Sequence, residues 1–224
     1  MKKMANTKKP GFDIDNQLLD YDQSDFLREL GNIGSGNAIT ALSRLTGKNV
    51  NISLPSVQVV DFYEVMAHVK NAETELFGII SNIDGKVKMV LVHLYSKNAV
   101  ITILQELMGA NSLDISNITS VEELEGNTKD IILEIGNIVT GHYASALANL
   151  TGQTLLPDVP ILVFDHVNAI MDGLIARSAE KFDKVLLIST QMMLDEQVID
   201  GDLLFLPDAE GLEALFTIMK KLEN

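Results

Sequence analysis

One polar pattern occurs twice in this chain, 105 residues apart, and it limits the possible folds more than any other feature. Each copy contains an aspartate, a glutamate, an asparagine and, 23 residues after the asparagine, a proline. The positions are Asp25, Glu29, Asn32 and Pro55 in the first copy, and Asp130, Glu134, Asn137 and Pro160 in the second. Between residues 25–47 and 130–152, eleven of 23 aligned positions are identical. Solenoid units repeat every ~20 to 50 residues, so this longer period predicts two halves that share one fold.

The composition predicts a soluble globular protein. The chain has 224 residues, of which 46% are hydrophobic and 21% charged, enough for one sizeable core or two fused half-domains. No uninterrupted apolar run approaches the ~20 residues that cross a bilayer, and no apolar segment follows the lysines at the start. We therefore expect a cytoplasmic protein that does not insert into membranes.

Several kinds of site are excluded or disfavoured by the residue types. The chain has no cysteine, which excludes disulfides, thiolate nucleophiles and cysteine-ligated metals. Its histidines lack the spacing of a metal site, so we expect no intrinsic metal or other cofactor; they are His68, His93, His142 and His166. A net charge of −14 argues against nucleic acid and favours a protein partner with a basic face.

Both halves show the same order of predicted elements. Residues 1–20 are expected to form a flexible tail, because they carry few apolar side chains. The first half, about 21–110, predicts a helix from Asp22 to Thr46, strands over 51–54, 57–62, 75–83 and 87–94, and a helix over 97–108. A polar linker over 110–127 leads to the second half, about 126–224. It predicts a helix from Asp130, strands over 161–164, 173–178, 185–193 and 203–206, and a helix over 208–222.

This order favours an α+β fold built as a single domain from two repeats. Each half is interpreted as α-β-β-β-α, and the two halves are expected to share a β-sheet by pseudo-twofold symmetry. The motif helices are expected to be exposed on one side of the sheet. A Rossmann-type βαβ sheet fits poorly, because each half has strands in succession.

The motif residues share one face of each predicted helix. At about 100° per residue, Asp25, Glu29 and Asn32 lie together, and Leu30 and Ile33 lie on the other side. The second copy gives the same projection. A carboxylate and a carboxamide are thus presented about one turn apart. A single Glu-x-x-Asn would be ordinary helix surface, but its recurrence in register indicates a function.

A glycine follows each asparagine on the same face. Gly36 and Gly141 each cost a helix about 1 kcal/mol relative to alanine, so both require a reason. Either the backbone of another molecule approaches there, or the two halves pack closely there. The segment Gly31–Gly36 does not predict a phosphate loop, because it has the wrong glycine order and continues a helix.

The aspartates and prolines of the pattern have structural explanations. Asp22 and Asn127 are N-cap candidates three residues before each aspartate, which places the aspartates in the first helical turn. Each proline begins a predicted strand. We expect a supporting role for these four positions, which are Asp25, Asp130, Pro55 and Pro160.

The doubled pattern resembles that of the CheC-type chemotaxis phosphatases, a group that includes CheX and FliY. The resemblance covers about residues 20–220, and two complete motifs in one chain are typical of the CheC members. It implies a phosphatase that hydrolyses the aspartyl phosphate of the response regulator CheY. It also implies that Glu29 and Glu134 anchor the regulator through its active-site lysine, and that Asn32 and Asn137 orient the attacking water. The regulator would supply its own Mg²⁺.

Two further expectations depend on the resemblance and on differences between the copies. Family members also bind the receptor deamidase CheD, so the alternative is an adaptor that regulates CheD and has weak or no phosphatase activity. His142 and Tyr143 stand where the first copy has Asn37 and Ala38. Their bulk predicts a less accommodating second surface and two sites of unequal activity.

Overall fold

One eight-stranded sheet is formed by strands from both halves of the chain. The computed structural model describes residues 21–52, 56–108, 115–177, 184–194 and 196–222. The first half comprises α1 (Tyr21–Thr46), β1 (Val50–Ile52), β2 (Ser56–Asp61), η2 (Phe62–Ala67), β3 (Glu75–Gly85), β4 (Met89–Ser96) and α2 (Lys97–Met108). After the short helix η3 (Val121–Glu123), the second half comprises α3 (Thr128–Thr151), β5 (Leu155–Pro157), β6 (Ile161–His166), α4 (Val167–Arg177), β7 (Lys184–Leu194), β8 (Gln197–Pro207) and α5 (Ala209–Leu222).

The two halves exchange their short strands. The strand order is β1-β7-β8-β4-β3-β5, with β2 also paired to β7 and β6 also paired to β3. The described pairs are antiparallel. The order reads the same from both edges when each strand is replaced by its counterpart in the other half. Each half therefore completes the sheet edge of the other, which confirms an α+β fold with a shared sheet.

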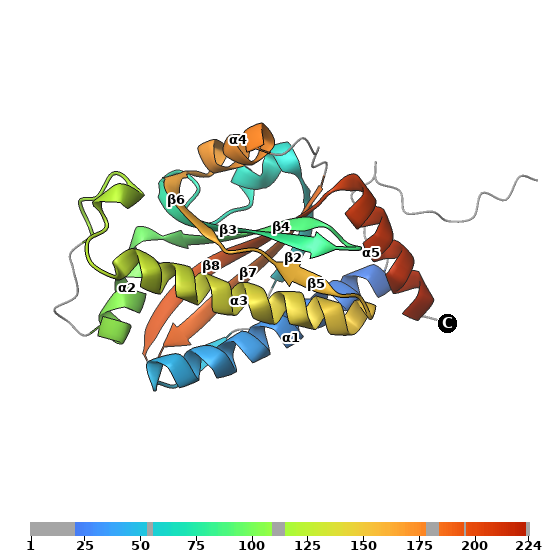
Figure 1. The fold of residues 1–224 in the computed structure, drawn as a ribbon, viewed down its shortest axis with the longest axis horizontal. Helices are drawn as coiled ribbons and strands as arrows, with labels where there is room; N and C mark the ends of the chain where they lie inside the picture. The colour runs from blue at the N-terminus through green and yellow to red at the C-terminus, as the bar shows by residue number, and fades with distance from the viewer. Residues whose placement is uncertain (1–20, 53–55, 109–114, 178–183, 195, 223–224) are drawn as a thin grey trace, which may run out of the picture.

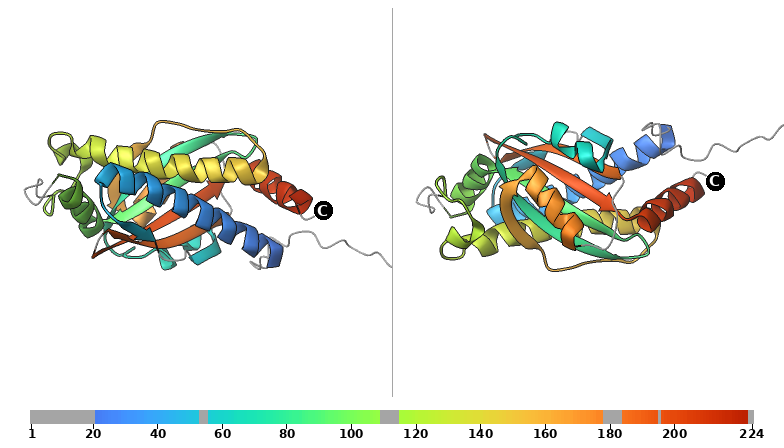
Figure 2. Two further views of the ribbon diagram at one scale, coloured as in Figure 1. Left: turned by 90° about the horizontal axis from the view of Figure 1, so that it is seen from below. Right: turned by 90° about the horizontal axis from the view of Figure 1, so that it is seen from above.

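Helices cover both faces of the sheet. The motif helices α1 and α3 lie side by side on one face, whereas η2 and α4 lie on the other (Figures 1 and 2). Leu30, Leu147 and Phe205 belong to the core under the motif helices. Phe62 and Met171 belong to the core on the opposite face. None of the helices in the described part of the chain is long and apolar enough to span a membrane.

The described part of the linker is packed against the body. Ile115 and Ile118 are buried in a cluster that also contains Phe77 and Phe164. The Lys97 ammonium lies 4.9 Å from the centre of the Phe164 ring and donates to the Ser116 and Ile118 carbonyls at 3.1 and 3.0 Å. Although residues 110–127 are mostly polar, Ile115 and Ile118 therefore attach this segment to the core.

Several sequence predictions are corrected by the structure. Residues 173–178 were predicted as a strand, but 173–177 belong to α4, whose Val167, Ile170, Met171 and Leu174 bury one helical face. The pattern missed β5 and the first half of β8. Each half has four strands with a short helix between the second and the third, so the order α-β-β-β-α is wrong. The helix α1 already begins at Tyr21, so Asp22 is not its N-cap. The predicted tail, 1–20, lies outside the described residues.

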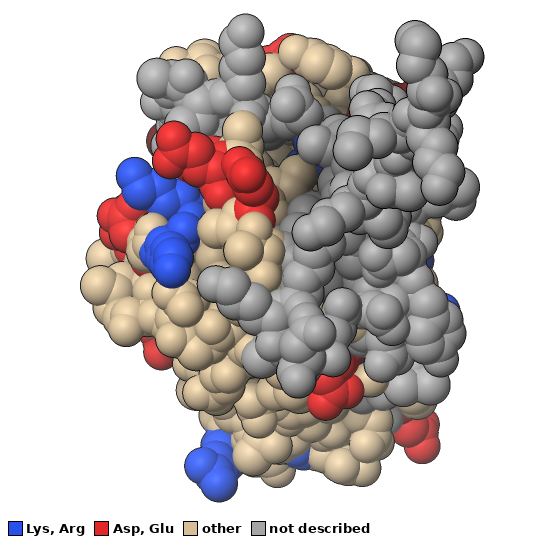
Figure 3. All heavy atoms as spheres, turned by 90° about the vertical axis from the view of Figure 1, so that its right-hand side faces the viewer, with Lys and Arg blue, Asp and Glu red and all other residues tan. Residues whose placement is uncertain are grey.

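Charges of both signs are mixed on the end of the molecule at the right of Figure 1. In the view of that end, basic and acidic side chains lie side by side at the upper left, and a separate basic side chain lies at the lower left (Figure 3). The described surface in this view therefore shows no broad basic area.

His93 on β4 gives the fold a pH dependence. Its side chain is 2% exposed, its Nε2 lies 2.9 Å from Thr140 Oγ1 on α3, and burial lowers its pKa from 6.5 to about 3. Between these values the unfolded chain binds the proton and the folded chain does not, so stability falls as the pH drops from 6.5 towards 3. We expect His93 to account for a loss of about 2 kcal/mol between pH 7 and pH 5.

Urea unfolding at both pH values measures this effect. The variant His93→Gln should show a smaller loss of unfolding free energy on acidification than the wild type does. An identical loss in the two proteins would show that other groups cause the acid sensitivity.

Candidate functional site

The structure presents both Glu/Asn pairs to solvent on the motif helices. Glu29 and Asn32 on α1 are exposed, as are Glu134 and Asn137 on α3. Since α1 and α3 pack against each other on the same face of the sheet, the two pairs are carried by one helical layer (Figure 2). The helical projection is thereby confirmed for these four residues. Leu45, an apolar residue near the end of α1, is 47% exposed.

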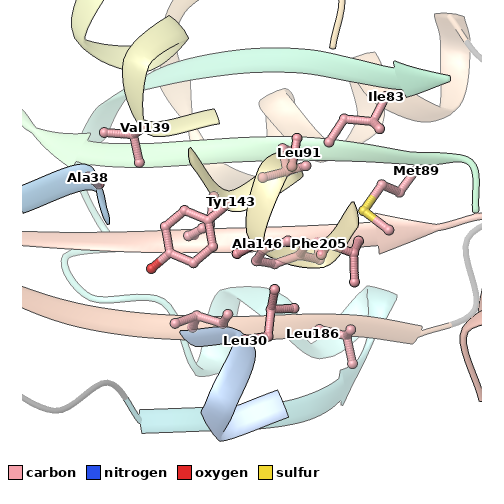
Figure 4. Close-up of a cluster of buried hydrophobic side chains, with 14 of the residues drawn as sticks. Leu30, Ala38, Ile83, Met89, Leu91, Val139, Tyr143, Ala146, Leu186 and Phe205 are labelled. Atoms are coloured by element: carbon pink, nitrogen blue, oxygen red, sulfur yellow. The ribbon is translucent and has the colours of Figure 1, made fainter. Parts of the chain in front are cut away.

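Tyr143 lies at the contact between the motif helices. Its side chain is 3% exposed, and its ring meets the Phe205 ring edge-on at 5.6 Å between centroids (Figure 4). Ser35 Oγ donates to the Gly31 carbonyl at 2.6 Å, so the Tyr143 hydroxyl, 2.8 Å away, donates to Ser35. Burial raises the pKa of Tyr143. Tyr143 adds no bulk to the second surface, so that prediction was wrong for this residue.

Gly34 and Tyr143 are complementary across this contact. A Cβ atom added at Gly34 would overlap the Tyr143 ring. At the positions related by the repeat, Val139 replaces Gly34 and Ala38 replaces Tyr143, and both lie in the same buried cluster. The smallest and the largest residue, Gly34 and Tyr143, thus face each other, and two residues of intermediate size, Val139 and Ala38, stand at the repeat-related positions. This explains why Gly34 does not recur in the second copy.

The glycines that follow the asparagines have no packing role. A Cβ atom added at Gly36 or at Gly141 would meet no described atom within 4 Å. Close packing is provided instead by Gly34 and by Gly136, where an added Cβ would overlap Ile79. Of the two explanations that the sequence left open, close packing of the halves therefore does not account for Gly36 and Gly141.

The second Glu/Asn pair opens onto a groove of about 370 Å³ between α3 and the segment that joins β5 to β6. The lining residues are Asp130, Leu133, Glu134, Asn137, Pro157, Asp158, Val159 and Pro160. All four motif positions of the second copy thus border one space. Three carboxylates and no lysine or arginine belong to this lining, so the groove favours a cationic group on whatever enters it.

Pro160 and Asp130 have the structural positions predicted for them. Pro160 is buried immediately before β6, and Asp130 lies in the first turn of α3 after the N-cap residue Asn127. In the first copy, Asp25 belongs to α1, but its side chain and the whole of Pro55 lie outside the described residues. The structure adds that Asp130 and Pro160 also line the groove.

The sequence did not predict the wall of the groove opposite α3. This wall is formed by Pro157, the last residue of β5, and by Asp158 and Val159, which follow it; β5, a strand of three residues, was not predicted. The available signal was the repeat itself, because β5 and β1 occupy equivalent positions in the two halves. A strand predicted near residue 51 therefore implied another near residue 156.

Comparisons with known proteins agree with the repeat. The model of the CheC-like family matches residues 23–59 and 128–164, which contain both Glu/Asn pairs and both prolines. Both repeats of this chain therefore match the CheC-like family. The CheY-P phosphatase CheC of Bacillus subtilis (strain 168) is 24% identical over 200 residues, which is 88% of this chain and 94% of that protein.

Solved structures share the fold. Thermotoga maritima FliY has a TM-score of 0.69 at 19% identity, over 91% of this chain and 98% of the FliY chain. A chain of the CheX–CheY–BeF₃–Mg²⁺ complex from Borrelia burgdorferi has a TM-score of 0.50 at 13% identity, over 79% of this chain and 96% of that chain. At these identities the likeness concerns the fold alone, so function has to be argued from the site.

Proposed function

We propose that this chain is a phosphatase of the CheC type, which hydrolyses the aspartyl phosphate of a CheY-type response regulator. The observation that carries the proposal is the recurrence of an exposed Glu/Asn pair on both motif helices, within the two segments that match the family. The relative CheC from Bacillus subtilis bears the name of a CheY-P phosphatase, which supports this activity.

The pair suits a reaction in which the catalyst mainly has to place water. In the proposed reaction, water attacks phosphorus, the bond to the aspartyl oxygen breaks, and the products are the free carboxylate and inorganic phosphate. The leaving group is already good, so positioning accounts for most of the catalysis. The amides of Asn32 and Asn137 have an oxygen that accepts from water and an NH₂ that donates, which orients water without strong basicity.

The glutamates are proposed to hold the regulator in place. Glu29 and Glu134 each precede the asparagine by three residues, so both side chains emerge from the same helix face. Either carboxylate can pair with a lysine beside the phosphoryl group. The acidic lining around Glu134 strengthens this attraction, and Mg²⁺ bound by the regulator adds to the positive charge of the approaching surface.

The decay of a phosphorylated CheY-type regulator tests the proposal. The reaction is followed with no added protein, with this chain, and with this chain plus CheD. Faster decay with this chain alone is the expected result. CheD binding without faster decay would contradict the phosphatase and support the adaptor instead.

Substitution of Gly36 or Gly141 is predicted to affect stability and activity in opposite directions. Gly36→Ala and Gly141→Ala should each raise the free energy of unfolding by up to about 1 kcal/mol, because alanine favours the helix and its methyl group meets nothing. We propose that these glycines admit the backbone of the regulator, so the same variants should raise KM. Gly34→Ala is the matched control, and it should destabilise the fold because of the Tyr143 ring. Alanine variants that gain stability and keep the wild-type KM would contradict the proposed role.

A further inference from the structure

Beside the second Glu/Asn pair, the register of pairing with β3 shifts by one residue between β5 and β6. On β3, the partner of Pro157 is Ile83 and the partner of Ile161 is Ile80. Four residue steps from β5 to β6 are therefore set against three steps on β3, which leaves one extra residue in the connecting segment. Like the extra residue of a β-bulge, this residue can redirect side chains, and such insertions are frequent next to active sites. The first half repeats the shift, because Ile52 pairs with Met192 and Ser56 pairs with Ser189.

The segment between β5 and β6 is hydrogen-bonded to β3. The Asp158 amide donates to the Asn82 carbonyl at 2.8 Å, and the Asn82 side-chain amide lies 3.4 Å from Asp158 Oδ2. Pro160 on the other side is buried, and its ring fixes the backbone dihedral φ. Val159 lies between Asp158 and Pro160, so the backbone on both sides of it is held in place.

Val159 projects from this anchored backbone into solvent at the mouth of the groove. Its side chain is 87% exposed, although valine is an apolar residue, and it lines the same space as Glu134 and Asn137. Valine is stiff about χ1, so it loses little freedom when a partner covers it. An apolar contact of this kind beside three carboxylates fits a protein surface that has an apolar patch next to a cationic site.

From this arrangement we propose that Val159 is a docking contact of the second site and determines how tightly that site binds the phosphorylated regulator. The inference rests on the proposed function, since it assigns the occupant of the groove. That occupant has the matching charge, because its phosphoryl site carries a lysine and Mg²⁺ that face the acidic lining. Val159 itself does not take part in the chemistry. The repeat places another apolar residue, Leu54, at the equivalent position of the first copy.

Variants that isolate one site test this inference. Asn32→Ala leaves only the second site active. In that background, Val159→Ala should raise KM for the phosphorylated regulator by about fivefold to tenfold, because the contact of two methyl groups is lost, and should leave kcat unchanged. Val159→Ile keeps the contact and should keep KM. Val198→Ala is the matched control, because Val198 is also exposed, at 55%, but lies on β8.

The same substitution in the Asn137→Ala background tests whether the effect is specific to the second site. In Asn137→Ala, where only the first site is active, Val159→Ala should change neither KM nor kcat. An unchanged KM in the Asn32→Ala background would overturn the inference while leaving the phosphatase intact. So would a complete loss of activity in Asn32→Ala itself, because the second groove would then not be a working site. If the wild type did not accelerate the decay at all, the proposed function would fail and this inference with it.

Discussion

The double variant Asn32→Ala with Asn137→Ala is expected to lose the acceleration of regulator dephosphorylation, by a factor of at least about 100. The reason is that alanine neither accepts a hydrogen bond from the attacking water nor donates one, so the water is no longer held in line with the phosphoryl group. Both asparagines are exposed, and neither contributes to the buried clusters. The fold should therefore remain intact.

A third asparagine provides the matched control for this variant. Asn149 is also exposed on α3 but lies three turns beyond Asn137, so Asn149→Ala should retain the wild-type rate. Far-UV circular dichroism and thermal unfolding check that all variants are folded. A double variant that accelerates dephosphorylation as fast as the wild type does would refute the assigned role of the asparagines.

Replacement of Tyr143 by alanine is expected to destabilise the protein by roughly 3–5 kcal/mol. The ring fills the contact between α1 and α3, where it covers Gly34 and meets Phe205. Its removal leaves a cavity that the helices can close only by shifting from their positions on the sheet. Tyr143→Phe should cost only about 1 kcal/mol. It removes the hydrogen bond to Ser35, whose hydroxyl keeps its bond to the Gly31 carbonyl.

Urea unfolding followed by far-UV circular dichroism measures these costs, since the chain has no tryptophan to report by fluorescence. Tyr63 is 86% exposed on η2, so Tyr63→Ala is the control and should change stability by no more than about 0.5 kcal/mol. A similar small effect for Tyr143→Ala would mean that the ring does not hold the two motif helices together.

The motif helices and the exposure of their polar face could be predicted because both depend on local periodicity. A helical repeat of apolar residues buries Leu30 and Ile135, and it leaves Glu29, Asn32, Glu134 and Asn137 exposed. The same reasoning failed for α4. Its apolar residues lie close together over a short stretch, and a short apolar run does not distinguish a buried helix from a buried strand.

The pairing of strands and the wall of the groove could not be predicted in this way, because both depend on contacts between distant segments. The sequence does not show that β6 pairs with β3 of the other half, or that Asp158 is bonded to Asn82. The contact of Gly34 with Tyr143 spans the two repeats, so it appears in neither repeat taken alone. Comparison of the repeats recovers part of this information, as the equivalence of β1 and β5 shows.

The chain is proposed to carry two Glu/Asn pairs that work separately on the same kind of substrate. The most direct test compares the decay of a phosphorylated CheY-type regulator in the presence of the wild type, Asn32→Ala, Asn137→Ala and the double variant. We predict that each single variant keeps part of the acceleration, that the two partial accelerations together approach that of the wild type, and that the double variant has none. Complete loss of the acceleration in either single variant would contradict two independent sites.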